Sequence, residues 1–238
     1  MPRFNCASWA LTSGCLAVMM SASAGGVAAQ TAPALQGVVS YETRQVSKAG
    51  VTRVETWQEN MYRSDSTVWT ERILPANAGH AGQHAHARGA KADAAHKHLD
   101  IDTSARWLQQ DSAGVVTLHY VDKANKVVVS VPKAEFGAVG FDGRWDTAAY
   151  LVPPDLVAKM KFAGPATGGA VWRTEQAQDW THRVLWSEAK KIALQIESKK
   201  TDGSFSRTIR LVPRLVAAVA PWAALGTFEQ KKYDDYMD

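Results

Sequence analysis

Residues 192–212, IALQIESKKTDGSFSRTIRLV, contain the pattern that decides the fold class. Two runs with β-branched and aromatic residues, Ile192–Lys199 and Phe205–Val212, flank the turn Thr201-Asp202-Gly203. Asp-Gly between two such runs is a strong signal for a β-hairpin, because both residues accept the positive φ that tight hairpin turns require. The stretch therefore predicts two antiparallel strands that follow each other directly.

Short strands separated by turn residues are predicted over most of the chain. The further strands are Gly37–Val46, Val51–Arg63, Thr67–Leu74, Ala105–Gln110, Val115–Val121, Lys126–Val131, Val171–Gln176 and Trp180–Ser187. One short helix is predicted from an N-cap at Asp146 to Tyr150, and another over Asp155–Lys161, just after two prolines. The Ala-rich run Pro213–Leu225 predicts a third helix, interrupted at Pro221. This is an α+β fold, an antiparallel sheet with two or three short helices on one side.

Residues 1–29 have the composition of a secretory signal peptide. Arg3 supplies the positive start, Trp9–Met20 is mostly apolar, and the small residues Val27-Ala28-Ala29 fit a cleavage site. The apolar run is too short to span a bilayer. We therefore expect residues 30–238 to form a single exported domain that is not an integral membrane protein. Because Cys6 and Cys15 both lie in the leader, that domain has no thiol.

Composition and motifs argue against two classes of protein. The net charge is only +4, and the basic residues are spread along the chain, which gives no support for nucleic-acid binding. No known catalytic motif occurs. The carboxylates of Asp142 and Asp146 are explained by an Asp-Gly turn and a helix N-cap. We expect a protein that is not an enzyme and needs no organic cofactor.

The segment Gly79–Asp102 contains five of the seven histidines. One antiparallel register pairs His84 with His98 and His86 with His96, and it sets His80 opposite Asp102. Side chains alternate along strands, so these residues and Asp100 would all point to one face of a hairpin inserted at 76–103. Imidazole and carboxylate suit Zn, Cu or Ni. The predicted ligands of a divalent metal are His80, His84, His86, His96, His98, Asp100 and Asp102.

Three other interpretations of this segment stay open. It could be a solvated Ala/Gly-rich loop that binds metal only loosely, or a pH-sensitive loop, since histidine titrates near pH ~6.5. It could also belong to a metal-dependent hydrolase or oxidase, which would need an open coordination position beside a pocket.

The register of the predicted His-rich hairpin also has a consequence for the flanking strands. If the hairpin register continues outward, Leu74 faces Leu108 and Arg72 faces Gln110.

The chain also resembles a family of exported proteins. Arg183–Glu188, Ile192–Glu197 and Asp202-Gly203-Ser204 are similar to the strand–turn–strand pattern of periplasmic proteins of the LolA, LolB and RseB type. The opening hairpin from Gly37 and the helix around Leu156–Met160 lie in compatible places. The resemblance implies a strongly curved antiparallel sheet, an incomplete barrel with helices in its concavity. It implies a general binding role and assigns no individual functional residue.

Two functions follow from these observations. The first is a non-catalytic periplasmic binding or accessory protein whose His-rich hairpin binds a divalent metal. The alternative, implied by the resemblance, is a carrier of lipid or lipoprotein acyl chains, or an envelope-stress sensor that contacts an envelope protein. In the alternative the eight tryptophans of residues 30–238, which would normally anchor a core, could instead line an apolar cavity.

Overall fold

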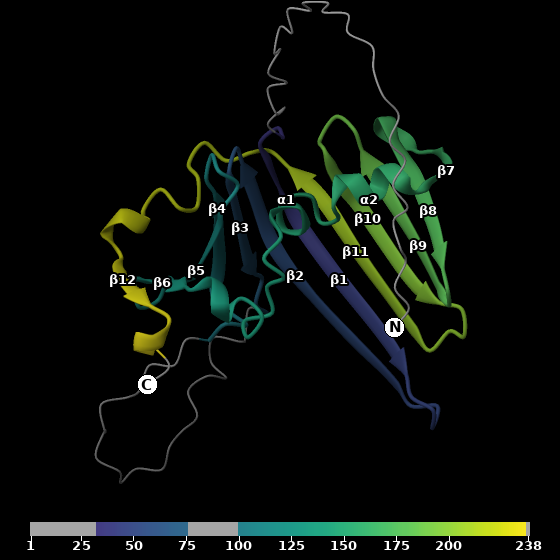
Figure 1. Cartoon of the computed structure of the whole chain (residues 1–238), viewed down its shortest axis with the longest axis horizontal. Helices are drawn as coiled ribbons and strands as arrows, with labels where there is room; N and C mark the ends of the chain where they lie inside the picture. Colours follow the sequence, from purple (N-terminus) through teal and green to yellow (C-terminus); the bar gives the residue numbers. More distant parts are fainter. Residues whose placement is uncertain (1–31, 76–99, 237–238) are drawn as a thin grey trace, which may run out of the picture. The chain divides into compact units, whose positions relative to one another are not determined.

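A computed structural model of the chain describes residues 32–75 and 100–236. In this part of the chain twelve strands form one sheet in the order β12-β6-β5-β4-β3-β2-β1-β11-β10-β9-β8-β7 (Figure 1). All neighbouring strands are antiparallel except β12 and β6, which are parallel. Strands β12 and β7 are the two edges, so the sheet does not close into a barrel. The predicted α+β fold with a curved antiparallel sheet is confirmed.

The strand boundaries agree closely with the sequence pattern in ten cases. The strands are β1 (Leu35–Val46), β2 (Thr52–Ser64), β3 (Thr67–Arg72), β4 (Ala105–Gln110), β5 (Val116–Asp122), β6 (Val127–Val131), β7 (Lys161–Pro165), β8 (Ala170–Ala177), β9 (Trp180–Ser187), β10 (Ile192–Lys200), β11 (Phe205–Arg214) and β12 (Glu229–Lys232). The pattern missed the two edge strands, β7 and β12.

The hairpin of β10 and β11 forms at the predicted turn. Gly203 has a φ of 73°, which glycine adopts without strain. The carboxylate of Asp202 accepts hydrogen bonds from the amide and the hydroxyl of Ser204, at 2.9 and 2.7 Å. These local bonds hold the turn and lower the pKa of Asp202. They also favour the register in which Ile196 pairs with Ile209.

One face of the sheet, called the inner face below, packs against the helices. Its apolar side chains include Val39, Met61 and Leu118, which are fully buried. They belong to one core cluster with Phe141 of the loop after β6 and with Ala149 of α1 (Trp145–Tyr150). Figure 1 shows α1 and α2 (Pro154–Lys159) against the sheet at this face. The helix predicted over Asp155–Lys161 forms, but it begins one residue earlier, with Pro154 at its first position, and ends at Lys159, because Lys161 already belongs to β7.

The opposite, outer face is covered over β2–β6 by the C-terminal segment. Trp222 contacts Tyr62 edge to face at 5.0 Å, and Leu225 is buried in the same cluster as Trp69. The helix predicted over Pro213–Leu225 is wrong: β11 continues to Arg214, and the amide of Ala217 donates to the side chain of Gln36 at 2.8 Å. Pairing with β1 outcompetes a helix that Pro221 would interrupt.

Strands β3 and β4 flank the His-rich segment, and their pairing differs from the one expected if the hairpin register continued outward. Val68 pairs with Leu108, so the expected pairings of Leu74 with Leu108 and of Arg72 with Gln110 are wrong. Arg72 pairs instead with Glu59 on β2, and β3 ends there, before Pro75. The pairings of the histidines themselves lie outside the described residues, as does the predicted leader. Within residues 32–75 and 100–236, no helix has the length and apolar character needed to cross a bilayer.

Candidate functional site

A pocket of about 250 Å³ lies on the inner face, between the sheet and α1. It is called the inner pocket below. Its walls come from β1, β3, β4, β11, the loop before α1, and α1 with its C-cap residue. The lining residues are Tyr41, Val68, Thr70, Arg106, Leu108, Gly140, Phe141, Asp142, Thr147, Ala148, Leu151, Arg207 and Ile209.

The floor of the inner pocket follows from strand alternation. Tyr41 pairs with Ile209 across β1 and β11, and Val68 pairs with Leu108 across β3 and β4. Directly paired residues point to the same face of a sheet. Because β2 lies between β1 and β3, the two pairs are held at opposite sides of the floor. Val68 and Leu108 are almost completely buried, which gives that side of the floor an apolar surface.

The roof of the inner pocket is made by α1 and the loop before it. Phe141 packs edge to face on Phe136 at 5.0 Å, and the carboxylate of Asp142 accepts a hydrogen bond from the Arg144 amide at 2.9 Å. The predicted Asp-Gly turn is therefore present. Asp146 is not the N-cap, because the helix begins at Trp145 and Asp146 lies in its first turn. Leu151 ends the helix at a φ of 65°, a conformation that turns the chain over the pocket.

Arg63 fixes this roof to the sheet. Its buried guanidinium donates to the carbonyls of Ala149 at 2.8 Å, Pro33 at 3.1 Å, Lys191 at 3.0 Å and Lys190 at 2.6 Å. Burial lowers the pKa of Arg63 to about 10, so the group stays protonated near neutral pH. The acceptors come from α1, the segment before β1 and the β9–β10 turn, and one side chain therefore joins three separate parts of the chain.

A chain of polar contacts forms one wall of the inner pocket. The Tyr41 hydroxyl donates to Glu59 at 3.1 Å, and Arg106 lies 3.8 Å from the same carboxylate oxygen. Arg106 Nε also donates to the Thr70 hydroxyl at 3.1 Å. Burial, and next the negative charge of Glu59, raise the pKa of Tyr41 well above its usual value. Arg207 lies over the Tyr41 ring, 5.9 Å from its centre.

A second pocket of about 210 Å³ lies on the other side of Arg106 and Thr70, which line both cavities. It is more polar than the inner pocket, since Glu59 and Asp102 both border it. Trp57, which also borders it, stacks on Tyr41 with ring centres 4.8 Å apart. The apolar cavity and the polar one therefore share a wall that contains an arginine.

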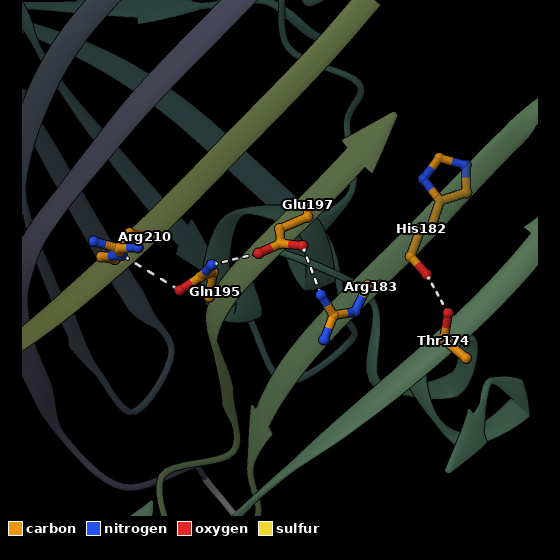
Figure 2. A network of polar contacts seen from close by, with 6 residues as sticks. All are labelled: Thr174, His182, Arg183, Gln195, Glu197 and Arg210. Atoms are coloured by element: carbon orange, nitrogen blue, oxygen red, sulfur yellow. Dashed lines mark hydrogen bonds and ion pairs between the residues drawn. The ribbon is translucent and has the colours of Figure 1, made fainter. Parts of the chain in front are cut away.

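The outer face carries a different polar network (Figure 2). Arg210 Nε donates to Gln195 at 3.3 Å, Gln195 donates to Glu197 at 2.7 Å, and Arg183 donates to the other oxygen of Glu197 at 3.2 Å. Arg183 also lies over the Trp172 ring at 4.5 Å. The partners satisfy one another across β9, β10 and β11, which is the role expected of cross-strand pairs on a solvated face.

The predicted metal ligands are only partly described. His80, His84, His86, His96 and His98 lie outside the described residues. Asp100 and Asp102 are exposed, and the amide of Asp102 donates to the Asp100 carboxylate at 3.1 Å. Within the described ranges no three His, Cys, Asp or Glu side chains come close enough to hold a metal ion.

The two remaining histidines have structural contacts. His119 packs against Trp107 at 4.9 Å, and its burial there lowers its pKa. His182 stacks on Trp180 and bonds through Nδ1 to the Ser198 hydroxyl at 2.9 Å. Both histidines therefore occupy cross-strand packing positions.

The described tryptophans do not line the inner pocket, and two of them belong to the core. Trp69 and Trp186 are buried in two separate apolar clusters, and no tryptophan is among the described residues that line the inner pocket. Sequence reasoning missed the pocket residues themselves. Strand alternation could have indicated that Tyr41 and Ile209 share a face of the sheet, but it does not indicate which helix covers them.

Comparisons with solved structures find weak likenesses of fold. A conserved protein from Thermus thermophilus is 9% identical with a TM-score of 0.38, over 82% of this chain and 90% of that one. A domain described as an outer membrane lipoprotein-sorting protein from Vibrio parahaemolyticus is 9% identical with a TM-score of 0.30, over 78% and 87%. A DUF1329 family protein from Desulfovibrio piger is 6% identical with a TM-score of 0.34, over 81% and 90%.

The resemblance predicted from the sequence thus recurs among these structures, as a weak likeness to a LolA-like domain. No protein-family model matches the sequence, and no curated protein matches it.

Proposed function

We propose that this protein is an exported, non-catalytic carrier whose inner pocket binds an acyl chain of a lipid or lipoprotein. The observation that carries the proposal is the lining of the pocket. Apolar side chains come from both its floor, at Val68, Leu108 and Ile209, and its roof, at Phe141 and Leu151. A site enclosed by apolar groups on two sides, with a few polar groups at one wall, is typical of a small-molecule binding pocket.

The size of the inner pocket suits part of one chain. Its volume of about 250 Å³ lies just below the usual range of ligand pockets, about 300–1,000 Å³. Each buried methylene contributes about 0.8 kcal/mol, so a segment of about eight methylenes of an acyl chain would contribute about 6 kcal/mol. That free energy corresponds to a Kd of about tens of micromolar before ordering costs. An affinity in this range suits a carrier that must release its cargo.

The location proposed for this activity is the periplasm. Residues 1–29 have the features of an export leader, and the thiol-free remainder needs no disulfide in an oxidising compartment. A lipid or lipoprotein in transit there needs an apolar site to shield its chains from water.

The proposal is tested by identifying the cargo. The protein is expressed with its leader, purified from the periplasm without detergent and extracted with organic solvent for mass spectrometry. We expect co-purified acyl chains from the native protein and none from Ala148→Phe, in which the larger side chain enters the pocket from α1. Ala189→Phe, on an exposed turn, is the matched control and should retain the lipid. Absence of acyl chains from the native protein would count against the function.

Divalent-metal binding by the His-rich segment is the second candidate. What supports it is the density of ligand-type residues in the sequence, with two exposed carboxylates, Asp100 and Asp102, where the described chain resumes. The two proposals are compatible, because the inner pocket uses none of the predicted metal ligands. A metal titration, described in the Discussion, tests this candidate independently of lipid binding.

A further inference from the structure

Two guanidinium groups reach the inner pocket from the inner face of the sheet, on strands at opposite sides of the pocket. Arg106 lies on β4 and Arg207 on β11, and both line the cavity together with the ring of Tyr41. Tyr41 lies between them in the network, because its hydroxyl shares Glu59 with Arg106 and its ring faces Arg207. Both cations therefore border a cavity whose floor and roof also contain apolar side chains.

The charge of Arg106 is already engaged. Its Nε donates to Thr70, and the carboxylate of Glu59 lies 3.8 Å from one of its terminal nitrogens. These contacts hold the guanidinium at the polar wall. They leave it able to donate to a further acceptor, since arginine has five N–H groups in a fixed plane.

Arg207 is differently placed. Its side chain is exposed at the open side of the pocket, and its described contact is with the face of Tyr41. Among the described residues no carboxylate lies within ion-pair distance of its guanidinium. Asp142 also lines the pocket; its Oδ1 accepts the Arg144 amide, and it forms no ion pair with Arg207. Arg207 therefore presents a positive charge at the mouth of an apolar cavity.

We propose that the ligand of the inner pocket is an anionic amphiphile, whose carboxylate or phosphate binds Arg207 and Arg106 while its chain lies under α1. The inference rests on the proposed function and adds the headgroup class to it. Hydrogen bonds from arginine to carboxylate or phosphate are charge-assisted and stronger than neutral ones. Loss of one such contact reduces binding roughly ten- to a hundredfold. An uncharged amphiphile of equal chain length cannot make it.

Isothermal titration calorimetry at neutral pH tests the inference with three probes of one chain length, dodecanoic acid, dodecyl phosphate and dodecan-1-ol. The variant Arg207→Gln removes the charge at the mouth of the pocket. Arg210→Gln is the matched control, because Arg210 lies on the same strand and hydrogen-bonds to Gln195 on the outer face. Arg106→Gln tests the second contact. Circular dichroism verifies that each variant is folded.

The expected result is at least tenfold tighter binding of an anionic probe than of dodecan-1-ol to the native protein. That preference should be lost in Arg207→Gln and kept in Arg210→Gln. The tighter of the two anions identifies carboxylate or phosphate as the source. Equal binding of all three probes, or a preference that survives Arg207→Gln, would overturn the headgroup assignment and leave the proposed function standing. Failure of every probe to bind would overturn both.

Discussion

The guanidinium of Arg63 donates a hydrogen bond of 2.8 Å to the carbonyl of Ala149, across the space between β2 and α1. Helix α1 has only six residues, too few to be stable alone, and tertiary contacts must hold it. The same arginine also binds the carbonyls of Pro33, Lys190 and Lys191. The roof of the inner pocket is therefore fixed to its floor by one buried side chain.

Replacement of Arg63 should destabilise the fold more than replacement of an exposed arginine. Arg63→Met keeps most of the buried volume but removes every donor to four carbonyls. An unpaired buried acceptor costs about 1–3 kcal/mol; the bond to Ala149 is buried and the other three are part-buried, so we expect a loss of about 3 kcal/mol in the free energy of unfolding. Urea denaturation measures it. Arg53→Met, on an exposed part of β2, should change stability by less than about 0.5 kcal/mol. Equal effects of the two variants would refute the anchoring role.

The raised pKa of Tyr41 predicts that the protein loses stability at alkaline pH. Burial and the carboxylate of Glu59 raise its pKa in the folded protein, while in the unfolded chain it titrates at its ordinary value of 10.0. Its contribution to stability is therefore complete below pH 10 and decreases as the pH rises above it, because only the unfolded state releases the proton. Unfolding of Tyr41→Phe, measured by urea titration on both sides of pH 10, should show a smaller alkaline loss than the native protein. An identical pH dependence would contradict the burial of this hydroxyl.

The lowered pKa of His119 predicts that the protein also loses stability as the pH falls on the acid side. Its burial beside Trp107 lowers its pKa below the ordinary value of 6.5. The unfolded chain then binds a proton before the folded protein does, so stability falls as the pH decreases from about 7 to about 5. His119→Phe keeps a ring against Trp107 and should lose less stability over this interval. The same acid-side slope in both proteins would show that other groups determine it.

Metal titration tests the His-rich segment separately. Zn²⁺, Cu²⁺ or Ni²⁺ at about a hundred times its Kd should stabilise the folded protein by about 2.7 kcal/mol. For a chain of this size that corresponds to an increase in Tm of about 5–10 °C. The combined replacement of His84, His86, His96 and His98 by alanine should remove the increase. If no metal changes Tm, or if the increase survives those replacements, the segment is not a metal site.

The sheet was largely predictable from the sequence because its strands alternate clearly and its turns have distinctive residues. Leu118 and Tyr120 are buried, whereas Thr117 is exposed and His119 is only half-buried, as alternation on such a strand requires. Strand β12 gave no such signal. Its four residues are polar, and it joins the sheet only through a parallel pairing with β6.

The inner pocket could not be predicted, for a physical reason. Its floor depends on which strands lie side by side, and its roof depends on where α1 packs, which no local pattern specifies. Arg63 is instructive: it lies two residues after the buried Met61, at a position that alternation assigns to the inner face. A charged residue at this position predicts that the buried region ends there. Arg63 is nevertheless buried, because its guanidinium donates to backbone carbonyls that are distant in the sequence.

The most direct test of the account locates a bound chain by methyl NMR. Dodecan-1-ol is titrated into the native protein with labelled leucine, isoleucine and valine methyl groups. Binding in the inner pocket should shift the signals of Val68, Leu108, Leu151 and Ile209. The competing apolar surface is the exposed segment after β11, where Leu215 and Val219 are 95% and 71% exposed. Shifts confined to Leu215 and Val219, with those of the inner pocket unchanged, would contradict the account.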